Sequence, residues 1–176
     1  GNSGTLARLL IGILSSTPNI RVKILGDHSL NKRNMKKLII LMNKFGASFL
    51  PKKKYTFPLQ LISSKMPIGI NYDAGVSAQL KSAVILAGLN SYGNTTIKEN
   101  ISSRDHTENL LKNKKRVIKI TKKKKKIIKI FGKKNLRNLK INISGDPSSA
   151  AFFTTLTLLN PKSSIKIKNV GLNPSR

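Results

Sequence analysis

Polar loops that carry an arginine recur at nearly equal intervals along this chain of 176 residues. Their arginines, Arg33, Arg104 and Arg176, lie 71 and 72 residues apart, and each loop follows a helix-like and then a strand-like segment. A period of about 70 residues exceeds the roughly 20 to 50 residues of a solenoid repeat and indicates a larger recurring unit. The order of patterns within one period is that of a βαβαββ unit.

The spacing of apolar residues predicts the elements of these repeats. Apolar side chains three and four positions apart predict helices, for which Ser77, Ser103 and the Asp146–Pro147 pair are candidate starts. Short apolar or alternating runs predict strands. The predicted helices are 5–16, 34–44, 78–89, 105–112 and 148–159, and the predicted strands are 20–25, 48–50, 55–62, 69–72, 95–98, 117–121, 126–131, 139–143 and 165–170. We therefore expect a mixed α/β (α+β) fold.

A net charge of +28 is typical of nucleic-acid-binding proteins, because clustered Lys and Arg release counterions from phosphate backbones. Residues 111–140 hold 15 of the 34 basic residues and no acidic one. Yet Lys, Ile and Asn make up 65 of the 176 residues, and A and T alone can encode all three, so an AT-rich genome accounts for the excess. The basic segment also lacks the interleaved aromatic residues on which single-strand binders stack bases. We expect no nucleic-acid partner.

The strands predicted at 117–121 and 126–131 alternate Ile with Lys. Such alternation is typical of half-buried strands with one solvated face. We interpret the segment as an antiparallel pair that exposes its lysines and is joined by a turn in the run Lys122 to Lys126. A binding patch for an anionic partner is the alternative interpretation.

Residue types that several kinds of chemistry need are scarce. The chain has no Cys, which excludes disulfides, thiolate metal sites and Cys nucleophiles within it. It has two histidines, His28 and His106, and six acidic residues that are scattered singly along the sequence. We expect no metal site and no cofactor. A membrane span needs about 18 consecutive apolar residues, and no run in the sequence approaches that length. No leader peptide is recognisable either, so we expect a cytoplasmic protein without a membrane partner.

Two segments suit anionic ligands. The loop 1–5 opens a helix, and the N–H groups and dipole of a helix N-terminus attract anions. Arg33 stands close to another helix start, and a guanidinium fork suits phosphate and carboxylate. Simpler explanations exist, since glycine-rich loops commonly only turn the chain and Arg33 could be an ordinary surface arginine. Ser77 and the segment 103–108 likewise suit plain helix capping.

Taken together, the polar segments resemble the EPSP synthase family (3-phosphoshikimate 1-carboxyvinyltransferase), in sequence and in order along the chain. The resemblance covers nearly the whole chain and is weakest over 112–140. Asn34 is a departure, because the family usually has proline after the arginine. The matching strings are GNSGT at 1–5, GDHSLNKRNM at 26–35, SAQLKSAVILAGL at 77–89, SRDHTENLL at 103–111, GDPSSAAFF at 145–153 and VGLNPSR at 170–176.

The resemblance implies a two-lobed enzyme, each lobe built from three βαβαββ units in an inside-out α/β barrel of the enolpyruvate transferase type. Residues 1–144 are then two units of an incomplete N-terminal lobe, and 145–176 are the start of an incomplete C-terminal lobe. Both ends of the chain look cut inside loops. We expect an internal fragment that is inactive alone, from a protein that is a monomer when complete.

The resemblance also implies the ligands. Phosphoenolpyruvate, and the herbicide glyphosate in the same pocket, would lie against Gly4, Arg33 and Gln79. Shikimate 3-phosphate would lie against Ser77, Ala78, Gln79 and Arg104. The implied reaction transfers the enolpyruvyl (1-carboxyvinyl) group to the 5-hydroxyl of shikimate 3-phosphate and releases phosphate, on the route to chorismate and aromatic amino acids. The proton-transfer groups are expected outside the chain, so no catalytic residue is assigned.

A related enolpyruvyl transferase that acts on UDP-N-acetylglucosamine shares the fold and is the nearest rival. That enzyme usually has a reactive cysteine on a mobile loop, and this chain has none. The strings SAQ at 77–79 and SRDHTE at 103–108 favour EPSP synthase.

Overall fold

A computed structural model describes residues 1–122, 124–136 and 140–175. The chain divides into a larger unit, Gly1–Leu136, and a smaller unit, Arg137–Arg176, which we describe separately. Arg176, the third arginine of the predicted period, and Leu139, the first residue of a predicted strand, lie outside the described residues. The assignment of residues 1–144 and 145–176 to two lobes stays a prediction.

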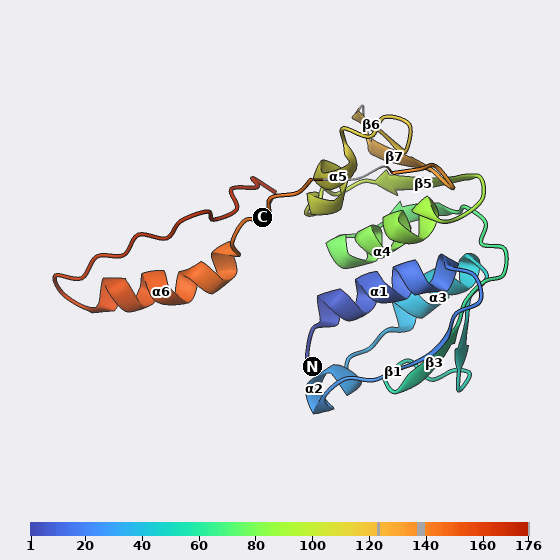
Figure 1. Cartoon of the computed structure of the whole chain (residues 1–176), viewed down its shortest axis with the longest axis horizontal. Coiled ribbons are helices and arrows are strands. Elements are labelled where there is room, and N and C mark those ends of the chain that lie inside the picture. The colour runs from blue at the N-terminus through green and yellow to red at the C-terminus, as the bar shows by residue number, and fades with distance from the viewer. Residues whose placement is uncertain (123, 137–139, 176) are drawn as a thin grey trace. The chain divides into compact units, whose positions relative to one another are not determined.

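The larger unit contains two copies of one element order (Figure 1). The first copy is α1 (Gly4–Ser16), β1 (Arg21–Ile24), α2 (His28–Asn31), α3 (Lys36–Lys44), β2 (Ser48–Leu50) and β3 (Leu59–Ile62). The second is β4 (Asn71–Ala74), α4 (Ala78–Leu89), β5 (Asn94–Glu99), α5 (His106–Leu111), β6 (Ile118–Lys122) and β7 (Lys126–Phe131). The second copy has the predicted βαβαββ order, and the first has the same order from its first helix onward, with the short α2 added.

The two sheets repeat the same strand order. The first sheet is β1-β3-β2, and the second is β4-β5-β7-β6, so β5, β7 and β6 take the places of β1, β3 and β2. All pairs are antiparallel except β4 with β5, which is parallel. Figure 1 shows α1, α3 and α4 between the two sheets. Helices inside and sheets outside are the predicted inside-out arrangement, which is confirmed.

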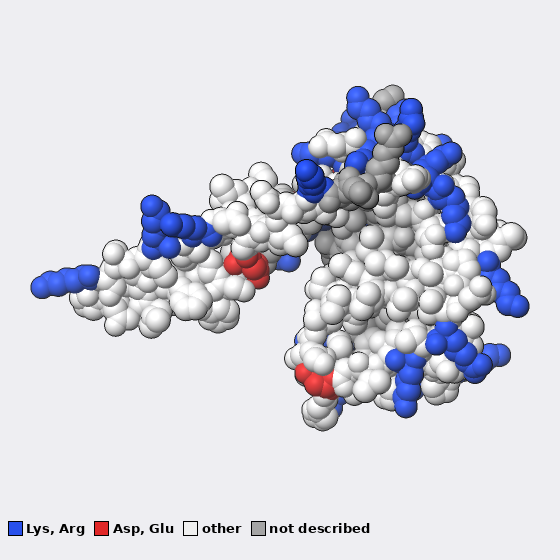
Figure 2. All heavy atoms as spheres, viewed as in Figure 1, with Lys and Arg blue, Asp and Glu red and all other residues white. Residues whose placement is uncertain are grey.

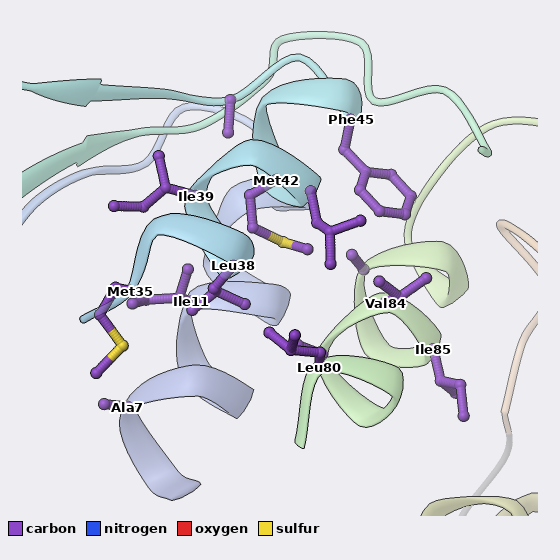
Figure 3. Packing of buried hydrophobic residues seen from close by; sticks show 14 of the residues in the cluster. Ala7, Ile11, Met35, Leu38, Ile39, Met42, Phe45, Leu80, Val84 and Ile85 are labelled. Carbon is purple, nitrogen blue, oxygen red and sulfur yellow. The ribbon is translucent and has the colours of Figure 1, made fainter. Parts of the chain in front are cut away.

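Helix α4 is the centre of the core. It packs against α1 and α3 on one side and against β5 and β7 on the other. Ala83, Val84 and Ile85 are fully buried, and Figure 3 shows Leu80 and Val84 directed toward α1 and α3. A helix that is covered on several faces must be apolar nearly all round. This explains why the sequence of α4 has no polar stripe beyond its first turns.

The lysine-rich strands have the predicted two faces. Ile128 and Ile130 of β7 and Ile118 of β6 are buried, whereas Lys119 and Lys122 are exposed. Figure 2 shows basic side chains gathered over the β6–β7 end of the larger unit, with others along the opposite sheet. The predicted antiparallel pair is confirmed, and the expectation that no nucleic acid binds stays a prediction.

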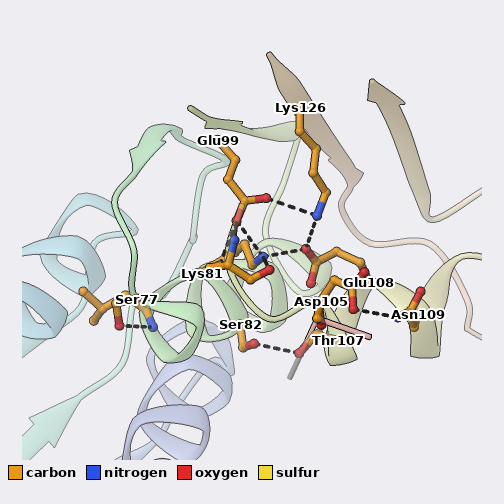
Figure 4. Close-up of polar contacts among 12 residues, drawn as sticks. Ser77, Lys81, Ser82, Glu99, Asp105, Thr107, Glu108, Asn109 and Lys126 are labelled. Carbon is orange, nitrogen blue, oxygen red and sulfur yellow. Dashed lines mark hydrogen bonds and ion pairs between the residues drawn. The ribbon is translucent and has the colours of Figure 1, made fainter. Parts of the chain in front are cut away.

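Lys126 departs from the predicted solvated face, because it belongs to a buried ionic cluster (Figure 4). Lys81 of α4 lies 2.9 Å from Glu99 of β5 and 2.7 Å from Glu108 of α5. Lys126 of β7 lies 3.1 Å and 2.9 Å from the same two carboxylates. Two positive and two negative charges therefore compensate each other where four elements meet. We call these four residues the ionic cluster.

Burial alone would raise the pKa of Glu99, but hydrogen bonds from Lys81, Ser103 and Lys126 outweigh it and lower this pKa to about 2. Burial likewise opposes the charge of Lys126, but its bonds to Glu108 and Glu99 raise the pKa of this lysine. Both groups are therefore held in their charged forms. The pairing within the cluster is what makes ionised side chains acceptable at a buried position.

Three local predictions were wrong. Ser103 does not cap α5, because that helix begins at His106 with Asp105 in the cap position and the Ser103 hydroxyl donates to Glu99 instead. Residues 140–143, the described part of a predicted strand, do not form a β-strand. The strand predicted at 165–170 is reduced to a single bridge between Gly145 and Val170. A β-strand needs a neighbouring strand with which it can form hydrogen bonds. Among the described residues of the smaller unit, these two segments have no strand partner apart from that bridge.

The smaller unit is dominated by α6 (Pro147–Leu159). Asp146 caps it as predicted, accepting a hydrogen bond of 3.1 Å from the Ser148 N–H, and Pro147 occupies the first turn. None of its residues is buried, although Phe152, Leu158 and Leu159 are large and apolar. No helix among the described residues is long and apolar enough to cross a membrane.

The close approach of α1 to α4 gives a first prediction. A Cβ added to Gly12 would lie 2.6 Å from the Ala83 carbonyl oxygen and 2.9 Å from its Cα, so the helix backbones leave no room for a side chain. Gly12→Ala should lower the unfolding free energy of the chain by about 1–3 kcal/mol, because overpacking forces the helices apart. Urea unfolding measures the change. Gly75→Ala is the control, since nothing lies within 4 Å of its added Cβ. Equal stability of the two variants would contradict this packing.

The ionic cluster gives a second prediction. A carboxylate whose folded pKa is lowered stabilises the fold above its unfolded value of 4.5, and this contribution is lost as the pH falls through about 2. Glu99→Gln should therefore cost about 3–5 kcal/mol near neutral pH, as expected when one partner of a buried pair is removed. The difference from the wild-type chain should shrink as the pH falls below about 4.5. Urea unfolding at several pH values tests this, and a pH-independent difference would disprove it.

Candidate functional site

The N-terminus of α1 carries the first group of predicted site residues. Ser3 caps the helix by accepting a hydrogen bond of 3.1 Å from the Leu6 N–H. Arg33, which follows α2, donates to the Asn2 side chain at 2.9 Å, so it lies beside the loop that opens α1. The first N–H groups of a helix have no partner within it and carry partial positive charge. This end of α1 therefore combines a guanidinium with a helix N-terminus.

Gly4 leaves room for two guanidinium groups. A Cβ at Gly4 would lie 2.5 Å from Nη1 of Arg33 and 2.9 Å from Nη1 of Arg8. Arg8 also donates to the Gly4 carbonyl oxygen at 3.0 Å. Gly4 is not among the described glycines with positive φ, so a special backbone angle does not explain its identity. A Cβ at this position would take space that the two guanidinium ends now occupy.

Arg8 was not predicted as a site residue. Burial, and then the positive charge of Arg33, lowers the pKa of Arg8. Two like charges at the same helix end repel each other, and a bound anion would relieve that repulsion. The sequence signal that could have found Arg8 is its position one turn after Gly4, where it is the single charged residue of an otherwise apolar helix.

The N-terminus of α4 carries the second group. Ser77 caps α4 by accepting from the Leu80 N–H at 3.4 Å, and Ala78 is the first helical residue. The Gln79 side chain donates to the Thr5 hydroxyl at 2.8 Å. This bond joins the N-terminal turns of α1 and α4, which are 74 positions apart in sequence. The structure therefore brings Gly4, Arg33 and Gln79 into one region.

Arg104 is connected to α4 through its neighbour in the sequence, Ser103. It is an exposed residue in the segment between β5 and α5. The preceding residue, Ser103, contacts Lys81 one turn into α4, through a bond of 3.4 Å from Lys81 Nζ to the Ser103 carbonyl oxygen. The loop of Arg104 is thus attached to the helix that begins with Ser77 and Ala78. Sequence reasoning did not identify this attachment.

A cleft of about 700 Å³ adjoins the two helix starts. Arg8, Ser77 and Gln79 contribute to its lining, together with residues of α3 and the segment after β4. Gly4, Arg33, Ala78 and Arg104 lie outside this lining. The cleft is of the size that small-molecule sites have. Among the described residues, no group of three or more His, Asp or Glu side chains gathers as metal ligands would.

The arrangement suits the binding of anions. Two helix starts, Arg8 and Arg33 supply positive charge, while Gln79 and Ser77 supply neutral polar groups. The buried carboxylates, Glu99 and Glu108, are already paired with lysines. Binding roles for the predicted site residues stay predictions.

Comparison with known proteins identifies the family of this chain. The family model for EPSP synthase (3-phosphoshikimate 1-carboxyvinyltransferase) matches residues 1–176. A 3-phosphoshikimate 1-carboxyvinyltransferase from Novosphingobium aromaticivorans is 41% identical over all of this chain, and one from Bacillus cytotoxicus is also 41% identical. The chain spans 40% and 41% of the length of these two relatives.

Solved structures give the same result. An EPSP synthase from Acinetobacter baumannii superposes with a TM-score of 0.79 at 36% identity, covering 100% of this chain and 39% of its own. The enolpyruvyl transferase NikO from Streptomyces tendae has a TM-score of 0.51 at 13% identity over 73% of this chain and 29% of its own, a likeness of fold alone. With a full-length family match and relatives at this level of identity, the chain belongs to the EPSP synthase family.

Proposed function

We propose that this chain is part of an enzyme that transfers the enolpyruvyl group of phosphoenolpyruvate to the 5-hydroxyl of shikimate 3-phosphate and releases phosphate. The observation that carries the proposal is the junction of α1 and α4, where Gln79 bonds Thr5 beside Arg33 and Arg8. Two anionic substrates must meet for this reaction. Two adjacent helix starts with arginines supply a suitable place.

The proposal assigns the residues as follows. Gly4 and Arg33 would face phosphoenolpyruvate, with the guanidinium on its anionic end. Ser77, Ala78 and Arg104 would face shikimate 3-phosphate. Gln79, whose side chain already spans the two helices, would contact both substrates.

The chemistry divides between this chain and the rest of the enzyme. The substrate hydroxyl adds to the enol carbon of phosphoenolpyruvate, which forms a tetrahedral intermediate, and phosphate then leaves to restore the double bond. This chain would neutralise the two anions and hold the reacting atoms together, which lowers the entropic part of the barrier. The groups that move protons would come from elsewhere in the protein. We include in the proposal a cytoplasmic monomer that needs no cofactor and binds neither membrane nor nucleic acid.

A phosphate-release assay tests the proposed function. A full-length enzyme carrying this sequence should release phosphate only when both phosphoenolpyruvate and shikimate 3-phosphate are present. The chain of 176 residues alone should release none. Absence of activity in the full-length enzyme, or activity in the chain alone, would contradict the division of labour proposed here.

Substitution of each arginine should impair the use of one substrate more than that of the other. In the full-length enzyme, Arg33→Ala should raise the KM for phosphoenolpyruvate by about ten- to a hundredfold, as expected for loss of a charge-assisted hydrogen bond of about 1.5–3 kcal/mol. Its effect on shikimate 3-phosphate should be much smaller. Arg104→Ala should show the reverse preference. Steady-state kinetics with each substrate varied in turn gives both constants, and equal effects on both substrates would refute the assigned roles.

Gly4 gives a further test that uses glyphosate as a probe. The methyl group of Gly4→Ala would press on the guanidinium ends of Arg33 and Arg8, which are flexible, so the fold should hold while the anion site changes. We expect the inhibition constant of glyphosate to rise by a larger factor than the KM for phosphoenolpyruvate. Gly1→Ala is the matched control in the same loop, with nothing within 4 Å of its added Cβ. A lowered unfolding midpoint with an unchanged ratio of the two constants would show a purely structural role for Gly4.

A further inference from the structure

Ser103 is held on all of its polar groups by two buried side chains. Its N–H and its hydroxyl both donate to Oε1 of Glu99, at 2.8 Å and 2.7 Å. Its carbonyl oxygen accepts from Lys81 Nζ at 3.4 Å, and Lys81 itself donates to the same Glu99 oxygen at 2.9 Å. The side chains of Lys81 and Glu99 are fully buried. The backbone at Ser103 is therefore fixed to the interior of the protein.

The two carboxylates of the ionic cluster, Glu99 and Glu108, can be compared with each other. Glu99 and Glu108 both contact Lys81 and Lys126, so they contribute equally to the balance of charge. Of the two carboxylates, only Glu99 accepts hydrogen bonds from Ser103. Figure 4 shows the two carboxylates on opposite sides of the lysines. Both carboxylates compensate the charge of the lysines, and Glu99 additionally attaches the loop through Ser103.

Arg104 follows Ser103 directly and is exposed. The direction in which its side chain leaves the backbone depends on how the peptide unit before it is held. A shift of about 1 Å in a positioning group is enough to impair a site. Since Glu99 and Lys81 connect Ser103 to α4, they also set the distance between Arg104 and the Ser77 end of that helix.

We propose that Glu99 is a positioning residue, which holds Ser103 so that Arg104 meets the phosphorylated substrate at the N-terminus of α4. The inference deepens the proposed function and rests on it. Glu99 touches no substrate itself and acts through the loop. Glu108 contributes to the stability of the same cluster without this role.

The test compares Glu99→Met with Glu108→Met in the full-length enzyme. Each variant removes one carboxylate from the cluster and leaves the other to both lysines. Glu99→Met should raise the KM for shikimate 3-phosphate about tenfold or more and change the KM for phosphoenolpyruvate less than about twofold. Glu108→Met should leave both constants within about twofold. Similar kinetic constants in the two variants would overturn the proposal.

Ser103→Ala leaves the ionic cluster intact and keeps the test informative if a methionine variant fails to fold, and Glu99→Gln gives a second comparison at position 99. Glu99→Gln retains an oxygen acceptor for Ser103 and should restore the KM for shikimate 3-phosphate to within about threefold of wild type. Ser103→Ala loses only the hydroxyl bond and should raise that KM about threefold, with the KM for phosphoenolpyruvate unchanged. An unchanged KM in Ser103→Ala, or a Glu99→Gln defect that affects both substrates equally, would count against positioning.

A readout without substrate separates this inference from the proposed function. The amide hydrogen of Ser103 should exchange at least about tenfold faster in Glu99→Met than in Glu108→Met, with each rate taken relative to the buried Ile97 of β5. Equal relative exchange would overturn the anchoring by Glu99 whatever the enzyme does. Lack of transfer activity in the wild-type enzyme would instead contradict the proposed function while leaving the exchange result interpretable.

Discussion

The burial of α4 on several faces is the constraint on which the rest of the larger unit depends. One side of the helix contacts α1 and α3, and the other contacts the second sheet. Gly12 of α1 permits backbone contact with Ala83, so the two helices run close together along their length. Because α4 is held from both sides, its N-terminal turn has a fixed position, and the Gln79–Thr5 bond can join it to the start of α1. The packing of the core therefore determines where the two helix starts of the candidate site lie.

Electrostatics follows from the same burial. Lys81 lies on α4 where the helix faces β5 and α5, so its ammonium cannot reach water and needs carboxylates nearby. Glu99 and Glu108 supply them, and Lys126 completes the balance from β7. Arg8 and Arg33 approach each other at the start of α1, and among the described residues neither of them forms an ion pair with a carboxylate. The four charges of the ionic cluster sum to zero, whereas the two arginines give the start of α1 a net positive charge.

Much of the fold could be predicted from the sequence. Regular apolar spacing predicted the main helices and most strands. The interval between Arg33 and Arg104 predicted that a structural unit repeats. The alternation of Ile with Lys predicted β6 and β7 as an antiparallel pair with one solvated face. The ionic cluster could not be predicted, because its members are far apart in the sequence. Glu99 lies 18 positions and Glu108 lies 27 positions after Lys81, and only the packing of α4 against β5 and α5 brings them together. Ser103 was misread as a cap for the same reason, since its partner Glu99 lies in a preceding strand.

The loops of Arg33 and Arg104 occupy equivalent positions in two copies of one structural unit, yet they are held by different means. Arg33 is secured at the surface through Asn2, whereas the residue before Arg104 is secured from the interior through Glu99. The two copies share the order of their elements and strands, and they differ in the residues that hold each arginine loop. One repeated backbone pattern can thus present two arginines that are held independently of each other.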